Sequence, residues 1–407
     1  MSRAFSRRRF LAFGSAFAAA PLLPAFADGP APAPAGPAAP PLPPEFPRET
    51  YRERQERALA AAKSAGLDAL VAVPSTSMAW LCGTDPGRSE RLMALVLRPK
   101  VPSAFVTPFF EEERVRRDAV VDRTAVWQEH EDPIRLLATL LSGARRIGVE
   151  GTTDFHTASR LRDATGARLV DAAGLFDGLR AVKSEAERAI LKDAASRMVA
   201  AIAATHARLA AGMTEKETGE VLSGELRRLG VRGGALVQFG ASAALPHGGP
   251  GDARLAKGDV VLIDGGCRIR GYTSDITRTV AFGSASDEVR KVYAAVDAAQ
   301  RAAFAAFRAG AIPEDVDRSA RKVIEDAGYG AFFTHRLGHG LGMDGHEAPY
   351  LVQGNRVPLV AGNVCTLEPG VYLPGRLGVR IEDDVVATAD GCEALSVRPP
   401  ELVVLPA

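Results

Sequence analysis

Net charge is nearly absent from this 407-residue sequence. Its 50 basic and 49 acidic residues leave a formal charge of +1, which argues against nucleic acid or another strongly charged partner. A convincing membrane span is also lacking, because the apolar stretch near the N-terminus is short and rich in alanine and glycine, and we interpret it as part of a cleaved segment. With 46% hydrophobic and 24% charged residues, the chain has the composition of a soluble globular protein and is long enough for two cores.

Cysteine is scarce as well. The four residues, Cys82, Cys267, Cys365 and Cys392, raise the question of a disulfide or a thiolate metal site in an exported protein. Strand parity argues against the thiolate site, because Cys267 and Cys365 each stand three positions from an acidic residue in a predicted strand and so point to the opposite face. We expect buried free thiols, with one disulfide as the alternative.

The first 27 residues are organised like an export signal. SRRRFL at positions 6–11 gives a basic region, an Ala-, Phe- and Leu-rich stretch follows, and AFA at 25–27 forms a small-x-small cleavage site. The arginines before Phe-Leu resemble a twin-arginine signal, which implies a periplasmic or secreted protein, with an uncleaved anchor as the alternative. Residues 28–46 are rich in proline and alanine, and we interpret them as an extended linker that builds no core.

Helical and strand patterns alternate over residues 47–180. This alternation predicts an α/β domain. Its sequence contains no cluster of residues typical of a catalytic or metal site. Its two isolated histidines, His130 and His156, are interpreted as surface or structural residues.

Residues 181–407 follow a different pattern. SEAE at 184–187 and TEKE at 214–217 have the form of capping boxes, and each opens a predicted helix. Two further helices, from about 286 to 310 and from 313 to before 328, precede a second set of strands. The segment is therefore predicted to repeat the order helix, helix, hairpin.

The first predicted hairpin carries two aspartates. Asp264 ends the apolar run VVLI, and Asp275 opens an alternating strand. If the turn is centred between Ile269 and Arg270, the two aspartates face each other at roughly 4.5–5.5 Å between Cβ atoms. Carboxylates that close need a proton or a cation between them, and a metal is the natural occupant. The alternative is that Asp264 merely precedes a Gly-Gly turn while Asp275 is solvated.

The second predicted hairpin carries two glutamates. Glu368 and Glu382 are placed symmetrically about Gly375, so they should also face each other. If the two similar halves pack face to face, four carboxylates converge.

Histidines cluster at the same places. Three lie within HRLGHGLGMDGHE, interleaved with glycines, and a fourth lies in ALPHGGP ahead of the first hairpin; they are His335, His339, His346 and His247. Three histidines in twelve residues are hard to read as structural.

These residues resemble the M24 metallopeptidase family, and within it the branch of Xaa-Pro dipeptidases and aminopeptidase P. The resemblance implies an α+β pita-bread catalytic domain behind an α/β N-terminal domain of the creatinase/prolidase type. It covers essentially the whole chain after the linker. The family's five metal ligands have counterparts in Asp264, Asp275, His339 of GHG, Glu368 of TLEPG and Glu382 of RIEDD.

Further roles are implied by the same resemblance. Glu368 corresponds to the residue that takes a proton from the attacking water, and His247 with His346 to the pair that hydrogen-bonds the scissile carbonyl. His335 corresponds to a substrate-positioning residue, while Arg380 and Tyr372 occupy positions that orient the carboxylates.

The ligand set is mostly oxygen, which suits two divalent ions, with Mn²⁺ expected first and Co²⁺, Zn²⁺ or Fe²⁺ as alternatives. Such a pair would lower the pKa of a water shared between the ions.

The expected activity is hydrolysis of the peptide bond before proline, as in an Xaa-Pro dipeptidase. Aminopeptidase P activity on longer peptides is the first alternative, and an M24-fold hydrolase or lyase of a small non-peptide metabolite is the second. The expected partner is a small Xaa-Pro peptide, with no nucleic acid and no membrane after signal cleavage. Homodimerisation is expected by resemblance alone.

Overall fold

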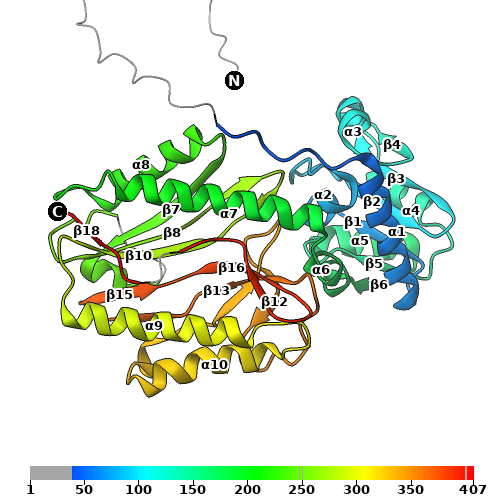
Figure 1. The fold of residues 1–407 in the computed structure, drawn as a ribbon. Coiled ribbons are helices and arrows are strands. Elements are labelled where there is room, and N and C mark those ends of the chain that lie inside the picture. Colours follow the sequence, from blue (N-terminus) through cyan, green and yellow to red (C-terminus); the bar gives the residue numbers. More distant parts are fainter. Residues whose placement is uncertain (1–38, 247, 250, 399–400) are drawn as a thin grey trace, which may run out of the picture. The chain divides into compact units, whose positions relative to one another are not determined.

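The computed structural model describes residues 39–246, 248–249, 251–398 and 401–407 (Figure 1). The predicted signal peptide, most of the predicted linker and His247 therefore lie outside the described residues. No helix in the described ranges is both long and apolar enough to cross a membrane.

The N-terminal region builds one six-stranded sheet in the order β4-β3-β2-β1-β5-β6, with β2 antiparallel to both of its neighbours and the other pairs parallel. Leu70 and Val71 alternate between the two cores that this sheet separates, as the two-residue period of a strand requires. Its elements are α1 Arg48–Ser64, β1 Ala69–Ala72, α2 Thr76–Cys82, β2 Ala94–Arg98, β3 Val101–Pro108, η1 Phe109–Glu111, α3 Glu112–Asp118, β4 Arg123–Trp127, α4 Pro133–Leu140, β5 Arg146–Val149, α5 Phe155–Thr165, β6 Arg168–Asp171 and α6 Ala173–Ala181.

The first half of the C-terminal region consists of two helices and a five-stranded sheet. The main path of this sheet is β18-β10-β8-β7, and β9 pairs with β8. Ser184 and Thr214 cap the helices through complete capping boxes, as predicted. The elements are α7 Glu185–His206, α8 Glu215–Arg228, β7 Arg232–Phe239, η2 Gly240–Ala244, β8 Val260–Ile269, β9 Tyr272–Thr273 and β10 Ile276–Phe282, with β18 Val404–Leu405 added from the end of the chain.

The second half repeats this arrangement with the sheet β12-β11-β13-β16-β17 and the separate ribbon β14-β15. In Figure 1 the strands of both halves lie between the α7–α8 pair and the α9–α10 pair, and Thr277 bridges to Glu382 where the halves meet. The predicted repeat of helix, helix, hairpin is confirmed. The elements are α9 Asp287–Ala306, α10 Pro313–Asp326, η3 Gly330–Phe332, β11 Gly338–Gly340, β12 Glu347–Leu351, β13 Val364–Leu367, β14 Gly370–Leu373, β15 Leu377–Arg380, β16 Asp383–Ala387 and β17 Cys392–Ala394.

The two hairpin registers differ in how well they were predicted. Gly370 pairs with Arg380 and Leu367 with Asp383, so Glu368 and Glu382 are opposite, as expected. The aspartate register was wrong by two residues, because Asp264 pairs with Thr277. The turn is Arg270-Gly271, with φ of 49° and 88°, and such a two-residue turn moves the centre one position along the chain. Asp275 is therefore diagonal to Asp264 on the same face.

The end of the predicted linker lies against the catalytic region. Arg197 of α7 donates to the carbonyls of Pro40 and Pro41, and Arg270 donates to the carbonyl of Pro43. Phe46 lies 5.9 Å from the Tyr272 ring, between ring centroids. Residues 39–46, here called the strap, have no helix or strand, as a proline-rich segment should. They nevertheless contribute to packing, because proline carbonyls remain acceptors.

Two buried ion pairs, here called the junction pairs, connect the N-terminal domain and the chain that leaves it to the catalytic domain. Arg54 Nη2 lies 2.9 Å from Glu187 Oε1, and Lys183 Nζ lies 2.6 Å from Glu347 Oε1. Glu187 also accepts a hydrogen bond from the Tyr272 hydroxyl. These carboxylates are therefore neutralised inside the protein.

All four cysteines are free, and all but the partly exposed Cys392 are buried. This confirms the expectation of free thiols. Cys267 and Cys365 belong to different hydrophobic cores of the catalytic domain and not to the site described next.

Candidate metal centre

A cavity of about 480 Å³ opens where the two halves of the catalytic domain meet. It collects all five predicted metal ligands, together with His335, His346 and Arg380. Its described lining consists of Pro246, Asp264, Asp275, His335, Arg336, His339, His346, Val352, Glu368, Arg380 and Glu382. Only His247 among the predicted site residues cannot be placed, because it lies outside the described residues.

His339 is held in β11 by close backbone contacts. A Cβ at Gly338 would lie 2.0 Å from the carbonyl oxygen of Thr366, so this position requires glycine. The His339 N–H donates to Thr366 Oγ1, and that hydroxyl donates to Glu368 Oε1 at 3.0 Å. His339 Nε2 lies 3.1 Å from the same carboxylate oxygen. One threonine therefore positions the imidazole and the glutamate together.

Three groups of side chains each offer ligand atoms within 4.8 Å of one another. Asp264, Asp275 and Glu382 form one group, and His339, Glu368 and Glu382 form another. Glu382 thus belongs to both, which is the arrangement expected of a ligand shared by two ions.

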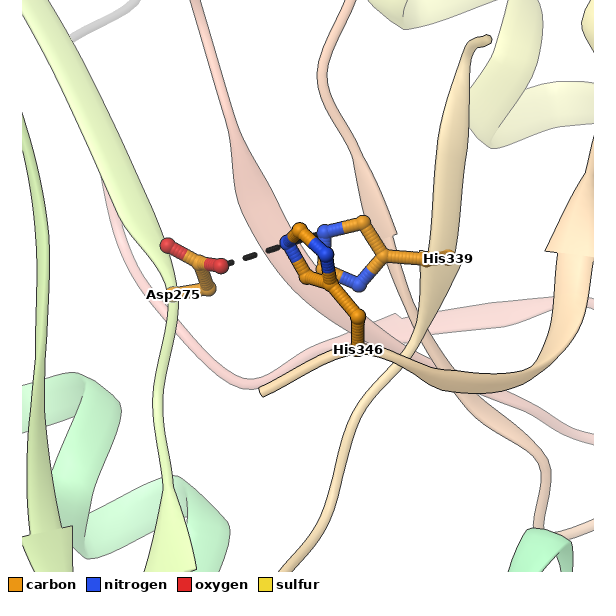
Figure 2. A group of neighbouring side chains, drawn as sticks. All are labelled: Asp275, His339 and His346. Carbon is orange, nitrogen blue, oxygen red and sulfur yellow. Dashed lines mark ion pairs between the residues drawn. The ribbon is translucent and has the colours of Figure 1, made fainter. Parts of the chain in front are cut away.

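The third group contains His346, which the sequence had assigned to substrate and not to metal. Figure 2 shows Asp275 facing His339 and His346, with His339 Nε2 at 3.9 Å from Asp275 Oδ2. The two imidazole centroids are 3.9 Å apart. His346 is the more exposed ring of the two, so it is the one that a substrate can reach.

The four carboxylates, here called the carboxylate cluster (Asp264, Asp275, Glu368 and Glu382), are short of positive charge. Burial, reinforced by the charge of Asp264, raises the pKa of Asp275 well above its usual value. Burial and the charge of Asp275 do the same to the pKa of Glu382. Burial also opposes ionisation of Glu368, but its contacts with His339 outweigh this effect and hold the pKa of Glu368 below its usual value.

Arg380 is the cation that the cluster already has. Its Nη2 lies 2.5 Å from Asp264 Oδ2, and its Nη1 donates to Tyr372 Oη at 2.7 Å. Tyr372 Oη is in turn 2.8 Å from His335 Nε2. Arg380 therefore contacts both Asp264 and Tyr372, while His335 is fixed by Tyr372 on one side of its ring and by the Arg336 carbonyl on the other.

Three residues that support the carboxylates of the site were not predicted from the sequence. Thr277 Oγ1 donates to Glu382 Oε2 at 2.6 Å, Thr366 supports Glu368, and Asp384 accepts a hydrogen bond from the Asp275 backbone N–H. Thr277 stands two positions after Asp275, and Thr366 stands two before Glu368. The two-residue period of a strand was thus a signal that could have found both threonines.

The residues present fit divalent cations. The eight carboxylate oxygens and the imidazole of His339 form an oxygen-rich donor set, which hard and intermediate divalent ions prefer. Burial and the charges of neighbouring carboxylates raise the pKa values of Asp275 and Glu382, and a bound cation would favour their ionised forms. The site therefore suits metal ions chemically as well as geometrically.

Paired hairpins presenting carboxylates and a histidine to one cavity define a metal-dependent hydrolase of the pita-bread fold. The chain belongs to metallopeptidase family M24: residues 189–389 match that family, and residues 54–182 match the Creatinase/Prolidase N-terminal domain. Proteins of this family bind divalent metals, so the enzyme class is metallopeptidase.

Individual relatives span nearly the whole chain. The probable dipeptidase PepE of Mycobacterium tuberculosis (strain ATCC 25618 / H37Rv) is 38% identical over 371 residues, covering 88% of this chain and 97% of the relative. The crystal structure of dipeptidase PepE from Mycobacterium ulcerans superposes with a TM-score of 0.85 at 36% identity, covering 89% of this chain and all of that one. The Xaa-Pro dipeptidase from Bacillus anthracis gives 0.80 at 32% identity, with 87% and 100% covered.

Proposed function

We propose that this protein is a dinuclear metallopeptidase that hydrolyses Xaa-Pro dipeptides. The observation that carries the proposal is the convergence of five predicted ligands, with Glu382 shared between two groups, in one cavity. Relatives named dipeptidase and Xaa-Pro dipeptidase support the substrate class.

The side chains divide the work. Metal ions bound by Asp264, Asp275, His339, Glu368 and Glu382 would polarise the attacking water and the scissile carbonyl. Glu368, whose pKa is lowered, is ionised at neutral pH and can accept the water's proton at Oε2, because Oε1 is bound by Thr366. His346 can donate a hydrogen bond to the carbonyl oxygen as charge develops there. Arg380 holds Asp264 in place throughout.

Proline supplies the selectivity. Its nitrogen carries no N–H once acylated and its ring fixes φ, so a site shaped around that ring disfavours other peptides. An aminopeptidase P activity on longer peptides is the second candidate, favoured by structural similarity to the X-Pro aminopeptidase from Thermotoga maritima, with a TM-score of 0.77 at 31% identity.

A single assay tests both candidates. The purified enzyme is offered Ala-Pro and Ala-Pro-Ala, with and without chelator and with Mn²⁺ restored, because Mn²⁺ is the metal that we propose. Release of proline from Ala-Pro, lost with chelator and regained with Mn²⁺, is expected. Cleavage of Ala-Pro-Ala alone would favour the aminopeptidase, and no cleavage of either would refute peptidase activity before proline.

Export and assembly are proposed on the sequence alone. If SRRRFL at positions 6–11 is a twin-arginine signal, changing Arg7 and Arg8 together to lysine should retain active enzyme in the cytoplasm with its signal attached. Unchanged export of the double-lysine protein, measured by cell fractionation, would refute the assignment. Homodimerisation is tested by light scattering, where a monomer mass would exclude it.

A further inference from the structure

His346 is placed by the loop that carries it and not by contacts of its own ring. It ends the loop of residues 341–346, here called the His346 loop, which joins β11 to β12. Within the part of the chain that the structure describes, no group forms a hydrogen bond with this exposed imidazole, whose centroid lies 3.9 Å from that of His339 (Figure 2). The backbone of the loop therefore determines where the ring lies.

The residues on either side of His346 are held from the N-terminal domain. Asp344 Oδ1 accepts a hydrogen bond from Thr76 Oγ1 of α2 at 2.5 Å, and its Oδ2 lies 2.6 Å from Arg180 Nη1 of α6. Glu347 Oε2 lies 3.4 Å from the same Nη1. One guanidinium thus contacts the residue two positions before His346 and the residue directly after it.

The catalytic domain holds the first half of the same loop. Arg268 of β8 donates to the Met343 carbonyl at 3.0 Å, and the Thr273 N–H of β9 donates to the Gly342 carbonyl at 2.8 Å. The Met343 side chain packs against one hydrophobic core in each domain. Because the ion pair of Asp344 comes from the N-terminal domain, both domains fix the loop.

The guanidinium of Arg180 is itself fixed. The residue is 8% exposed, and its Nη2 lies 2.9 Å from the Oδ1 of Asp177, three residues earlier in α6. A planar guanidinium that is bound at two edges cannot turn freely, and its hydrogen bonds to carboxylates are directional. Arg180 can therefore transmit the position of α6 to the His346 loop.

We propose that Arg180 and Asp344 are positioning residues for His346, so that the N-terminal domain takes part in catalysis through this loop. The inference rests on the proposed function, in which His346 donates a hydrogen bond to the scissile carbonyl. That bond strengthens as the carbonyl oxygen gains charge, so a displaced imidazole should lower kcat more than it raises KM.

Asp344→Asn tests the ion pair. On whichever of Ala-Pro and Ala-Pro-Ala the parent cleaves, kcat should fall about 5- to 50-fold, because the imidazole keeps its chemistry but loses its fixed place. KM should change less than about twofold, since the lost interaction belongs to the transition state. Bound Mn²⁺ should stay at the parental level, because Asp344 does not line the metal cavity.

Asp177→Asn is the matched control, because it removes a charge from the other edge of the same guanidinium. The Asp177 side chain is 42% exposed and that of Asp344 is 37% exposed. The two substitutions should therefore lower the melting temperature by comparable amounts. Only Asp344→Asn should lower kcat, since the contact between Asp177 and Arg180 lies within α6.

Thr76 gives a second, milder variant. Thr76→Val deletes the hydroxyl that donates to Asp344 and should lower kcat about two- to tenfold. Thr76→Ser keeps the hydroxyl and should retain the parental kcat.

A double-variant cycle shows whether Asp344 acts through His346. His346→Ala should lower kcat about 100-fold. Adding Asp344→Asn to it should then change kcat less than about twofold, because no imidazole remains to be positioned. Losses that multiply in the double variant would refute the inference, since they would indicate a general structural role.

The remaining outcomes separate the two claims. A parent that cleaves neither peptide refutes the proposed function and this inference with it. With an active parent, equal losses of kcat in Asp344→Asn and Asp177→Asn refute the inference alone. If Asp344→Asn does not fold, a parental kcat in Thr76→Val refutes it as well.

Discussion

Two groups of buried charges in this enzyme are treated in opposite ways. In the junction pairs each carboxylate has a cation within 3 Å, and the Arg54 charge together with the Tyr272 hydrogen bond overcomes burial and lowers the pKa of Glu187. In the carboxylate cluster, Arg380 is the only arginine or lysine of the described residues in an ion pair with the four acids, and burial with repulsion between the carboxylates raises the pKa of Asp275 and Glu382. The acids of the junction pairs are thus neutralised by the protein's own cations. The acids of the carboxylate cluster are left to be neutralised by ions from solution.

Removing metal should give the largest effect. Exhaustive chelation is expected to abolish peptidase activity and to lower the melting temperature, because binding to the folded state contributes about 2.7 kcal/mol at 100 times Kd. Restoring Mn²⁺ should recover both. Calorimetry of the two forms measures this. Equal melting temperatures with and without metal would contradict the view that the cluster depends on ions.

The same substitution in the two regions should act in opposite directions. Glu382→Gln removes a charge from the carboxylate cluster, so it should lower activity at least 100-fold and reduce bound metal, measured by elemental analysis. In the metal-free protein it should raise the free energy of unfolding by about 1 kcal/mol, because repulsion is relieved. A metal-free variant less stable than the metal-free parent would show that the cluster is not strained by its charge.

Glu187→Gln is the matched change in a junction pair. It leaves Arg54 buried without its counterion and should cost about 3 kcal/mol of unfolding free energy in urea titration. Metal content and kcat at 25 °C should stay at parental values, since Glu187 does not line the cavity. Loss of bound metal would mean that the two charged regions are coupled.

Low pH should remove the destabilising effect of Glu187→Gln. The pKa of Glu187 is lower in the folded protein than in the unfolded chain, whose value is about 4.3. The ion pair therefore contributes fully above about pH 4.3 and is lost as pH falls through the folded pKa. The difference in stability between parent and Glu187→Gln should shrink below about pH 4. A constant difference down to pH 3 would rule out ionisation of Glu187 as its origin.

Thr277→Val should give the smallest effect. It deletes the hydroxyl that donates to Glu382, so metal affinity should fall about tenfold while activity at saturating Mn²⁺ changes little. Thr205→Val is the control, because that hydroxyl is equally buried but bonds only within α7. Metal titrations that weaken equally in both variants would make the effect one of general packing.

The sequence predicted the parts of the site that depend on local periodicity. Strand alternation and the turn at Gly375 placed Glu368 opposite Glu382 correctly. The same reasoning misplaced Asp275 by two residues, because the turn residues Arg270 and Gly271 both adopt positive φ, and only Gly271 carried a visible signal for that.

Local patterns of this kind could not predict contacts between residues that are far apart in the sequence. Arg54 and Glu187 are 133 positions apart, and Lys183 and Glu347 are 164 apart.

The strap sets an order of events in time. Pro43 and Glu45 contact Arg270 across separations of 227 and 225 residues. At about 5–20 residues per second, the strap emerges from the ribosome on the order of ten to forty-five seconds before Arg270. During synthesis Pro40 and Pro41 can reach Arg197 first, but Pro43 and Glu45 can make their contacts with Arg270 only after the turn of the aspartate hairpin has formed. A fully docked strap therefore forms late in synthesis, after completion of the hairpin that carries Asp264 and Asp275, which are half of the carboxylate cluster.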